Sequence, residues 1–170
     1  KQNFKNIHAL EFSENKIKIL KNNEIRVLSF EELKNKNFKF DFIRLEQVLE
    51  HLDDLEFTLK LLSQICQNSS LVYISVPNSK KLFKKNWEEH LIVKGPAQPL
   101  EHLNSFTHFS LNKLLAKYNF RKLSVLSLFF LFVKNKKYNY VNIKYFLKTI
   151  YNNFFGTSLV LSKIDNSLKF

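Results

Sequence analysis

Short apolar segments alternate with segments of helical periodicity along this chain, and this alternation restricts the folds open to it. The apolar, strand-like segments are 6–12, 25–30, 38–46, 70–78, 122–133 and 156–164. The helical segments between them are 14–22, 31–36, 53–65, 110–120 and 139–155. In 53–65, for example, the leucines recur at spacings of four and three, as on one face of an amphipathic helix. The pattern predicts an α/β fold with a doubly wound sheet.

Polar residues at the ends of three strand-like segments indicate where a ligand binds. Segment 38–46, "FKFDFIRLE", is apolar on nearly all sides, which predicts a sheet covered on both faces. In such sheets ligands bind outside the carboxyl ends of the strands. Those ends fall at Glu11, at 45–51 and at Pro77–Asn78. These three places are therefore the candidate site.

Composition limits the classes of protein. The chain has 170 residues, suited to a single domain over 1–170, with 45% apolar residues and a net charge of +12. Only Arg26, Arg44 and Arg121 are arginine, the preferred reader of phosphates, so the lysine excess favours a solvated surface over a nucleic-acid site. A basic module that binds RNA or another polyanion stays open as the alternative.

Cysteine content and hydropathy favour a cytoplasmic location. The single cysteine, Cys66, excludes an internal disulfide and fits a reducing compartment; it is predicted to be buried and inert. The longest apolar run, Leu123–Val133, is shorter than the about 20 residues of a membrane-spanning helix. No signal peptide is visible. The chain begins at Lys1 and contains no methionine, so we expect it to be a fragment.

Two motifs in order resemble one enzyme family. The run "FDFIRLEQVLEHLDD" followed by a helix and "SVPN", and then "PLEHLNSFTHFSLNKLLAKYNF", are similar to the middle of class I S-adenosylmethionine-dependent methyltransferases, especially those among polysaccharide-modifying proteins. The resemblance spans about residues 6–132. It implies a Rossmann-like sheet, S-adenosyl-L-methionine as cofactor, and methyl transfer to a small molecule, such as a sugar or polysaccharide precursor. The acceptor itself is not named by these residues.

The resemblance also implies cofactor-binding residues. Glu11 would bind the ribose of the cofactor and Phe12 would line the adenine; helix capping and core packing are the alternatives. Ser29 and Phe30 stand where the family contacts the adenine, often through an acid that position 29 lacks. The methionine part of the cofactor would lie at the end of the third strand, at Leu45, Glu46 and Gln47.

Acceptor-side residues follow from the same resemblance. His102 and His51 are the candidate general bases, because imidazole titrates near neutral pH; a structural role that ties a loop to the sheet is the alternative. Asn78, Trp87, Glu101 and Phe106 are the candidate substrate-binding residues, with Phe83 and Asn104 nearby. No metal site is expected, because no His-x-x-x-His pair stands on a helix and His102 and His108 are six residues apart in an expected loop.

One departure from the family concerns glycine. These enzymes begin with a strand and a "GxGxG" turn, and the strand lies mid-sheet between the segments here numbered 6–12 and 38–46. This chain holds only Gly95 and Gly156, both elsewhere. We therefore expect a domain truncated at its N-terminus, with a helical insertion at about 134–155. That insertion's 139–155 helix also suggests peripheral membrane contact through Val141, Tyr145, Phe146 or Leu147, and Ile150, with sheet covering as the alternative. Oligomeric state is left open.

Overall fold

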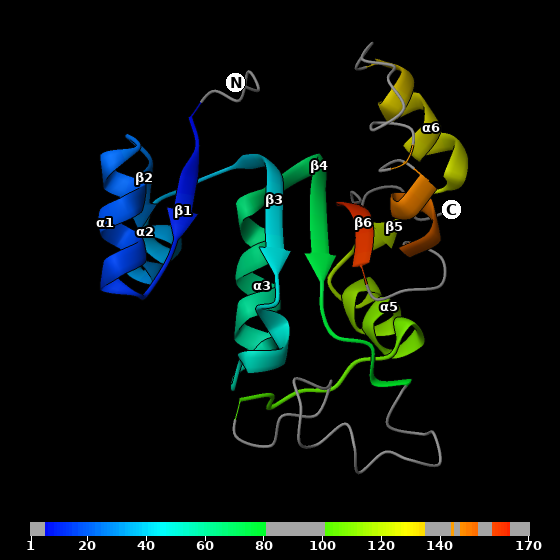
Figure 1. Ribbon diagram of the computed structural model, residues 1–170, viewed down its shortest axis with the longest axis horizontal. Coiled ribbons are helices and arrows are strands. Elements are labelled where there is room, and N and C mark those ends of the chain that lie inside the picture. Colours follow the sequence, from blue (N-terminus) through cyan, green and yellow to red (C-terminus); the bar gives the residue numbers. More distant parts are fainter. Residues whose placement is uncertain (1–5, 81–100, 135–143, 145–146, 153–157, 164–170) are drawn as a thin grey trace. The chain divides into compact units, whose positions relative to one another are not determined.

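The computed structural model describes residues 6–80, 101–134, 144, 147–152 and 158–163 (Figure 1). The chain forms two compact units, an N-terminal unit of Lys1–Lys39 and a C-terminal unit of Phe40–Phe170. Each unit contains its own hydrogen-bonded sheet. The expected single domain remains a prediction.

The N-terminal unit is a small β–α–β–α arrangement. It contains β1 (His8–Leu10), α1 (Glu14–Asn22), β2 (Arg26–Leu28) and α2 (Phe30–Asn35). β1 and β2 pair in parallel, with His8 opposite Arg26 and Leu10 opposite Leu28. The order of elements is the predicted one, and the strands are shorter than the apolar segments that contain them.

The C-terminal unit holds a mixed sheet of four strands. Its elements are β3 (Phe40–Glu46), η1 (Leu49–His51), α3 (Leu55–Ile65), β4 (Cys66–Ser75), α5 (His108–Ala116), β5 (Phe120–Lys122), α6 (Val125–Lys134) and β6 (Ser158–Lys163). The strand order is β3-β4-β6-β5, where β3 and β4 are parallel and β6 is antiparallel to both neighbours. The predicted α/β class is confirmed.

The core of the C-terminal unit forms where α3 and α5 pack against the sheet. Its fully buried members include Leu59, Val72, Ile74, Leu111 and Phe120. Figure 1 shows α3 alongside β3 and β4. The predicted apolar face of α3 is confirmed, since Leu59, Leu62 and Ile65 are buried. Cys66 is also buried, as predicted, although it begins β4 and does not continue the helix.

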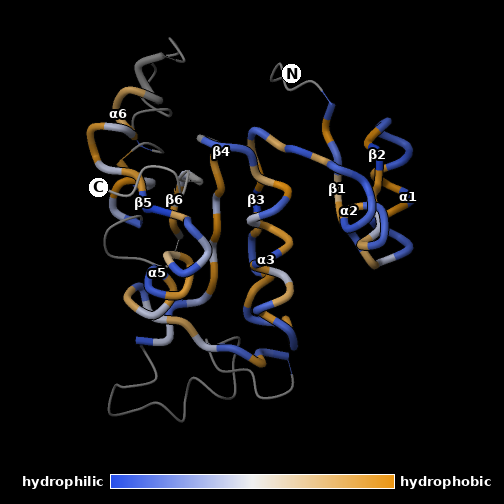
Figure 2. Tube along the Cα trace, turned by 180° about the vertical axis from the view of Figure 1, so that it is seen from behind, coloured by the Kyte–Doolittle hydropathy of each residue, from blue (hydrophilic) through white to orange (hydrophobic). Residues whose placement is uncertain are grey.

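The apolar run at 122–133 is a helix, and the strand expected there is wrong. β5 ends at Lys122, and Ser124 then caps α6: its Oγ accepts the backbone N–H of Ser127 at 3.1 Å. Figure 2 shows the predominantly hydrophobic colouring of this helix. In a continuous apolar run, the hydrophobic periodicity does not distinguish a buried strand from a buried helix. The apolar composition of this run therefore led to the wrong assignment.

Two smaller corrections concern the cap of α5 and one face of the sheet. α5 begins at His108 and is capped by Thr107, so Ser110 is its third residue and not its cap. β3 is not covered on both faces within the described residues, because Phe42 keeps 45% of its surface exposed. Of the segment 139–155, only Lys144 and residues 147–152 are described, and they are helical. Among the described helices, none has the length and hydrophobicity to cross a bilayer.

Candidate functional site

A pocket in the N-terminal unit brings together the four residues expected to bind adenosine. Its volume is about 400 Å³. Glu11, Phe12, Ser29 and Phe30 all line it. They meet because β1 and β2 are parallel neighbours, so the residues that follow their carboxyl ends lie at one edge.

Glu11 is held by the first backbone amides of the turn before α1. Its Oε1 accepts the N–H groups of Phe12 at 2.9 Å and Ser13 at 3.0 Å, while Lys16 Nζ lies 3.6 Å from Oε2. The hydrogen bonds from Ser13 and Phe12, with Lys16, hold the pKa of Glu11 below its usual value. The carboxylate is therefore ionised and oriented. Oε1 is engaged by these two backbone N–H groups, and Oε2 forms an ion pair with Lys16.

Ser29, Phe12 and Phe30 also line the pocket. Ser29 Oγ accepts the N–H of Glu32 at 3.1 Å, and Glu32 Oε2 accepts the N–H of Ser29 at 3.2 Å, which is a capping box for α2. The rings of Phe12 and Phe30 stack with centroids 5.7 Å apart, and Phe12 is 73% exposed. An exposed aromatic pair at a pocket is a surface on which a planar heterocycle stacks.

Three more predicted cofactor residues stand at the carboxyl end of β3. Gln47 has a positive φ of 54°, its N–H donates to the Ser75 carbonyl at 2.8 Å, and its side-chain Nε2 reaches the same oxygen at 3.4 Å. The Glu46 carboxylate pairs with Arg44, and Leu45 is half-buried. The left-handed turn at Gln47 redirects the chain from β3 into η1.

η1 places Glu50 and His51 beside His102. Glu50 is 1% exposed, and its carboxylate has no hydrogen-bond partner among the described residues. His51 Nε2 lies 4.0 Å from Glu50 Oε1, and the rings of His51 and His102 are 4.9 Å apart edge to face. The fold thus brings both predicted bases together across 50 residues of sequence.

The substrate candidates fall in different environments. Glu101 contributes its backbone carbonyl, which lies 2.7 Å from His51 Nδ1. Phe106 is a core residue at 5% exposure, where its carbonyl accepts the Ser79 N–H at 2.9 Å, and Asn78 forms an isolated bridge to it. The side chain of Asn78 accepts the N–H of Lys80. Trp87 and Phe83 lie outside the described residues.

Sequence reasoning missed two features of these sites. The pocket is also lined by Ile17, Lys21 and Glu31. Glu31 lies in the first turn of α2, and its position as an acid shortly after a strand end is the sequence feature that could have identified it. The backbone N–H of Asn104 donates to the Glu50 carbonyl at 3.0 Å, and its side chain donates to the carbonyls of Leu49 and Leu52. Sequence spacing carries no signal for that bridge, because it links segments about 50 residues apart.

Comparison with known proteins points to one family. The sequence profile described as methyltransferase domain matches residues 1–125 of the chain. No curated protein matches it significantly. The matched range covers more than half of the chain. The chain belongs to the methyltransferase domain family.

Solved structures share the fold at low sequence identity. One is a SAM-dependent methyltransferase from Thermotoga maritima, described as a possible histamine N-methyltransferase, at 20% identity and TM-score 0.52 over 68% of this chain. Another is a SAM-dependent methyltransferase from Archaeoglobus fulgidus, at 19% identity and TM-score 0.56 over 92% of this chain. This chain spans 55% of the first protein and 75% of the second.

Proposed function

We propose that this chain functions in S-adenosyl-L-methionine-dependent methyl transfer to a small molecule. The observation that carries the proposal is the pocket of the N-terminal unit, because all four residues expected to bind adenosine line it in a chain of the methyltransferase domain family. In this proposal Glu11 Oε2 accepts the ribose hydroxyls, and Phe12 and Phe30 lie against the adenine. Ser29 contributes backbone, since its side chain caps α2.

The remaining roles divide between the cofactor's methionine part and the acceptor. Leu45, Glu46 and Gln47 are proposed to bind the methionine part. The acceptor is proposed to be a sugar or polysaccharide precursor, with Asn78, Trp87, Glu101 and Phe106 as its binding residues. For Phe106 the contribution is its backbone, because the ring is buried in the core.

In methyl transfer the protein itself forms no covalent bond to the substrate. When bound, the cofactor would supply a methyl group already activated on its sulfonium sulfur: an acceptor oxygen, nitrogen or carbon would form the new bond, and the sulfur would keep the electron pair of the bond that breaks. The protein supplies alignment and, where the acceptor needs it, removes one proton. The proposed bases are His102 and His51. His51 is suited by its hydrogen bond, because Nδ1 must donate to the Glu101 carbonyl and Nε2 is then left as the acceptor.

The first test is cofactor binding measured by titration calorimetry. The wild-type chain is expected to bind S-adenosylhomocysteine, and Glu11→Gln to bind it at least about tenfold more weakly, since a hydrogen bond to a charged group contributes about 1.5–3 kcal/mol. Glu14→Gln is the matched control, because Glu14 is an exposed acid of the same unit outside the pocket. Equal affinity of Glu11→Gln and wild type would contradict the ribose role.

The alternative function has its own signature. A basic module is expected to bind RNA with an affinity that falls steeply with salt, and to bind no S-adenosylhomocysteine. That pair of results would replace the methyltransferase proposal. Liposome flotation of the full chain addresses membrane contact through 139–155, and we expect no flotation if that helix covers the sheet.

A further inference from the structure

Among the described residues of the C-terminal unit, Glu50 has a buried carboxylate. It is 1% exposed, and neither of its oxygens has a hydrogen-bond partner among the described residues. Burying an ionised carboxylate without a partner costs several kcal/mol, so such groups are found paired or bound to metals. The Glu50 carboxylate is therefore a candidate ligand for a cation.

His51 is oriented so that its free lone pair faces this carboxylate. Its Nδ1 lies 2.7 Å from the Glu101 carbonyl oxygen, and a carbonyl only accepts, so Nδ1 carries the proton. In the neutral ring the lone pair is then on Nε2, which lies 4.0 Å from Glu50 Oε1. A hydrogen bond from the second ring nitrogen to a backbone carbonyl is the usual arrangement of a metal-binding histidine.

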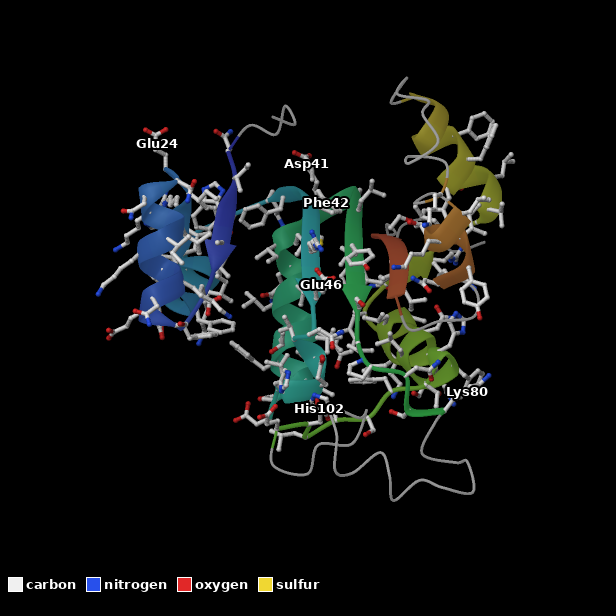
Figure 3. All side chains as sticks on the ribbon, in the orientation of Figure 1. Glu24, Asp41, Phe42, Glu46, Lys80 and His102 are labelled. Carbon is white, nitrogen blue, oxygen red and sulfur yellow. The ribbon has the colours of Figure 1, made fainter. Side chains whose placement is uncertain are left out.

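His102 completes the group from a distant segment of the chain. One ligand atom from each of Glu50, His51 and His102 lies within 4.8 Å of the others. Asn104 fixes the His102 segment against η1 through its bonds to the carbonyls of Glu50, Leu49 and Leu52. Figure 3 shows His102 at the end of the C-terminal unit to which the β3 and β4 arrows point.

We propose that Glu50, His51 and His102 bind one divalent transition-metal ion, with zinc as the best-fitting case. Two imidazoles and one carboxylate suit zinc, and hard ions such as Mg²⁺ prefer oxygen ligands. Tetrahedral zinc separates its ligand atoms by about 3.3 Å, so side-chain rotations that close the present spacing by about 1.5 Å complete the site. The His51 side chain is 41% exposed, which gives the ion a route in and an open fourth position.

The inference revises the expectation of no metal site. That expectation judged the histidines by their spacing in sequence, whereas η1 and Asn104 bring positions 51 and 102 together in space. It does not depend on methyl transfer, because it needs only three side chains of the C-terminal unit. A bound ion would occupy the lone pairs of both proposed bases, so the two roles exclude each other in one molecule.

The test is calorimetric titration of the full chain with ZnCl₂ after dialysis against a chelator. We expect one Zn²⁺ per chain, no detectable Mg²⁺ binding under the same conditions, and visible absorption bands of tetrahedral cobalt when Co²⁺ is used. Glu50→Gln and His102→Asn are each expected to weaken Zn²⁺ binding by more than about 100-fold. This is more than the loss of affinity typical when a group that only hydrogen-bonds to a metal ligand is replaced. Glu56→Gln and His108→Asn are the controls and should bind Zn²⁺ as the wild type does.

Glu50→Gln keeps the shape of the buried side chain, and circular dichroism checks that the variant is folded. Unchanged Zn²⁺ affinity of a folded Glu50→Gln variant would overturn the proposal. A wild-type chain that binds no Zn²⁺ would overturn it as well. Cofactor binding measured in the same samples separates this failure from failure of the proposed function, because S-adenosylhomocysteine binding does not require the ion.

Discussion

The Glu32 carboxylate accepts hydrogen bonds from three groups of the N-terminal unit. Its carboxylate bonds to Lys36 Nζ at 3.1 Å, to the Ser29 N–H at 3.2 Å and to Arg26 at 2.9 Å. Lys36, then Ser29 and Arg26, lower the pKa of Glu32 to about 2. This residue joins β2, the N-cap of α2 and the C-cap residue Lys36, so it stabilises the part of the pocket lining that carries Ser29 and Phe30.

Replacing Glu32 should make stability less dependent on pH. Because its pKa in the folded chain, about 2, lies below the ordinary 4.5, its contribution is complete above pH 4.5 and is lost as pH falls toward 2. Glu32→Gln is therefore expected to lower the thermal midpoint at pH 7, and the difference from wild type should shrink on acidification below pH 4.5. Thermal melts from pH 7 to pH 3 measure this, with Glu14→Gln as control. A difference that grows with acidification would contradict the assignment.

At the scale of single elements, α5 depends on a reciprocal cap. Thr107 Oγ1 accepts the Ser110 N–H at 3.1 Å, and Ser110 Oγ accepts the Thr107 N–H at 3.0 Å. Thr107→Ala removes the capping oxygen and should lower the free energy of unfolding by about 1 kcal/mol. Urea denaturation followed by circular dichroism measures the loss. Ser105→Ala, an exposed neighbour outside the cap, is expected to leave stability unchanged. Equal losses in both variants would show that the cap is not the cause.

The helical assignment of α6 gives a direct test against a strand. In a strand, positions 126 and 128 would share one face; in the helix, Leu128 is buried at 5% exposure and Leu126 is 63% exposed. Leu128→Ala should cost about 2–4 kcal/mol of unfolding free energy, and Leu126→Ala less than about 1 kcal/mol. Denaturant titration of the two variants decides the matter. Similar losses of unfolding free energy at both positions would contradict the helix and support the strand.

At the scale of the whole molecule, contacts between segments far apart in sequence build the end of the C-terminal unit. Asn104 holds η1 through three carbonyls across about 50 residues. Asn104→Ala leaves the part-buried carbonyls of Leu49 and Leu52 without this donor and should cost about 1–3 kcal/mol. It should also weaken Zn²⁺ binding about tenfold, while Asn112→Ala on α5 should not. Lost stability with unchanged Zn²⁺ affinity would separate the bridge from the proposed metal site.

The sequence by itself determined the α/β class, the order of most elements and the residues at the strand ends. These follow from local causes: the leucine period of α3, the acids before it, and the apolar segments at β3 and β4. The two motifs with the "VLEH" and "EHLNSFT" residues identified the methyltransferase family, which the domain profile over residues 1–125 confirms. The residues expected to bind adenosine line one pocket, because parallel strands bring their ends together.

Tertiary structure decided what no local pattern encodes. The sequence of α6 is compatible with a strand or a helix. It is a helix in the folded chain, where β5 ends at Lys122 and Leu128 is buried. β6 enters the sheet antiparallel between β4 and β5, a pairing set by partners distant in sequence. The turn at Gln47 and the hydrogen bonds of Asn104 bury the Glu50 side chain and place the His51 ring next to the His102 ring. Burial and long-range proximity belong to the folded chain, so they were beyond sequence reasoning.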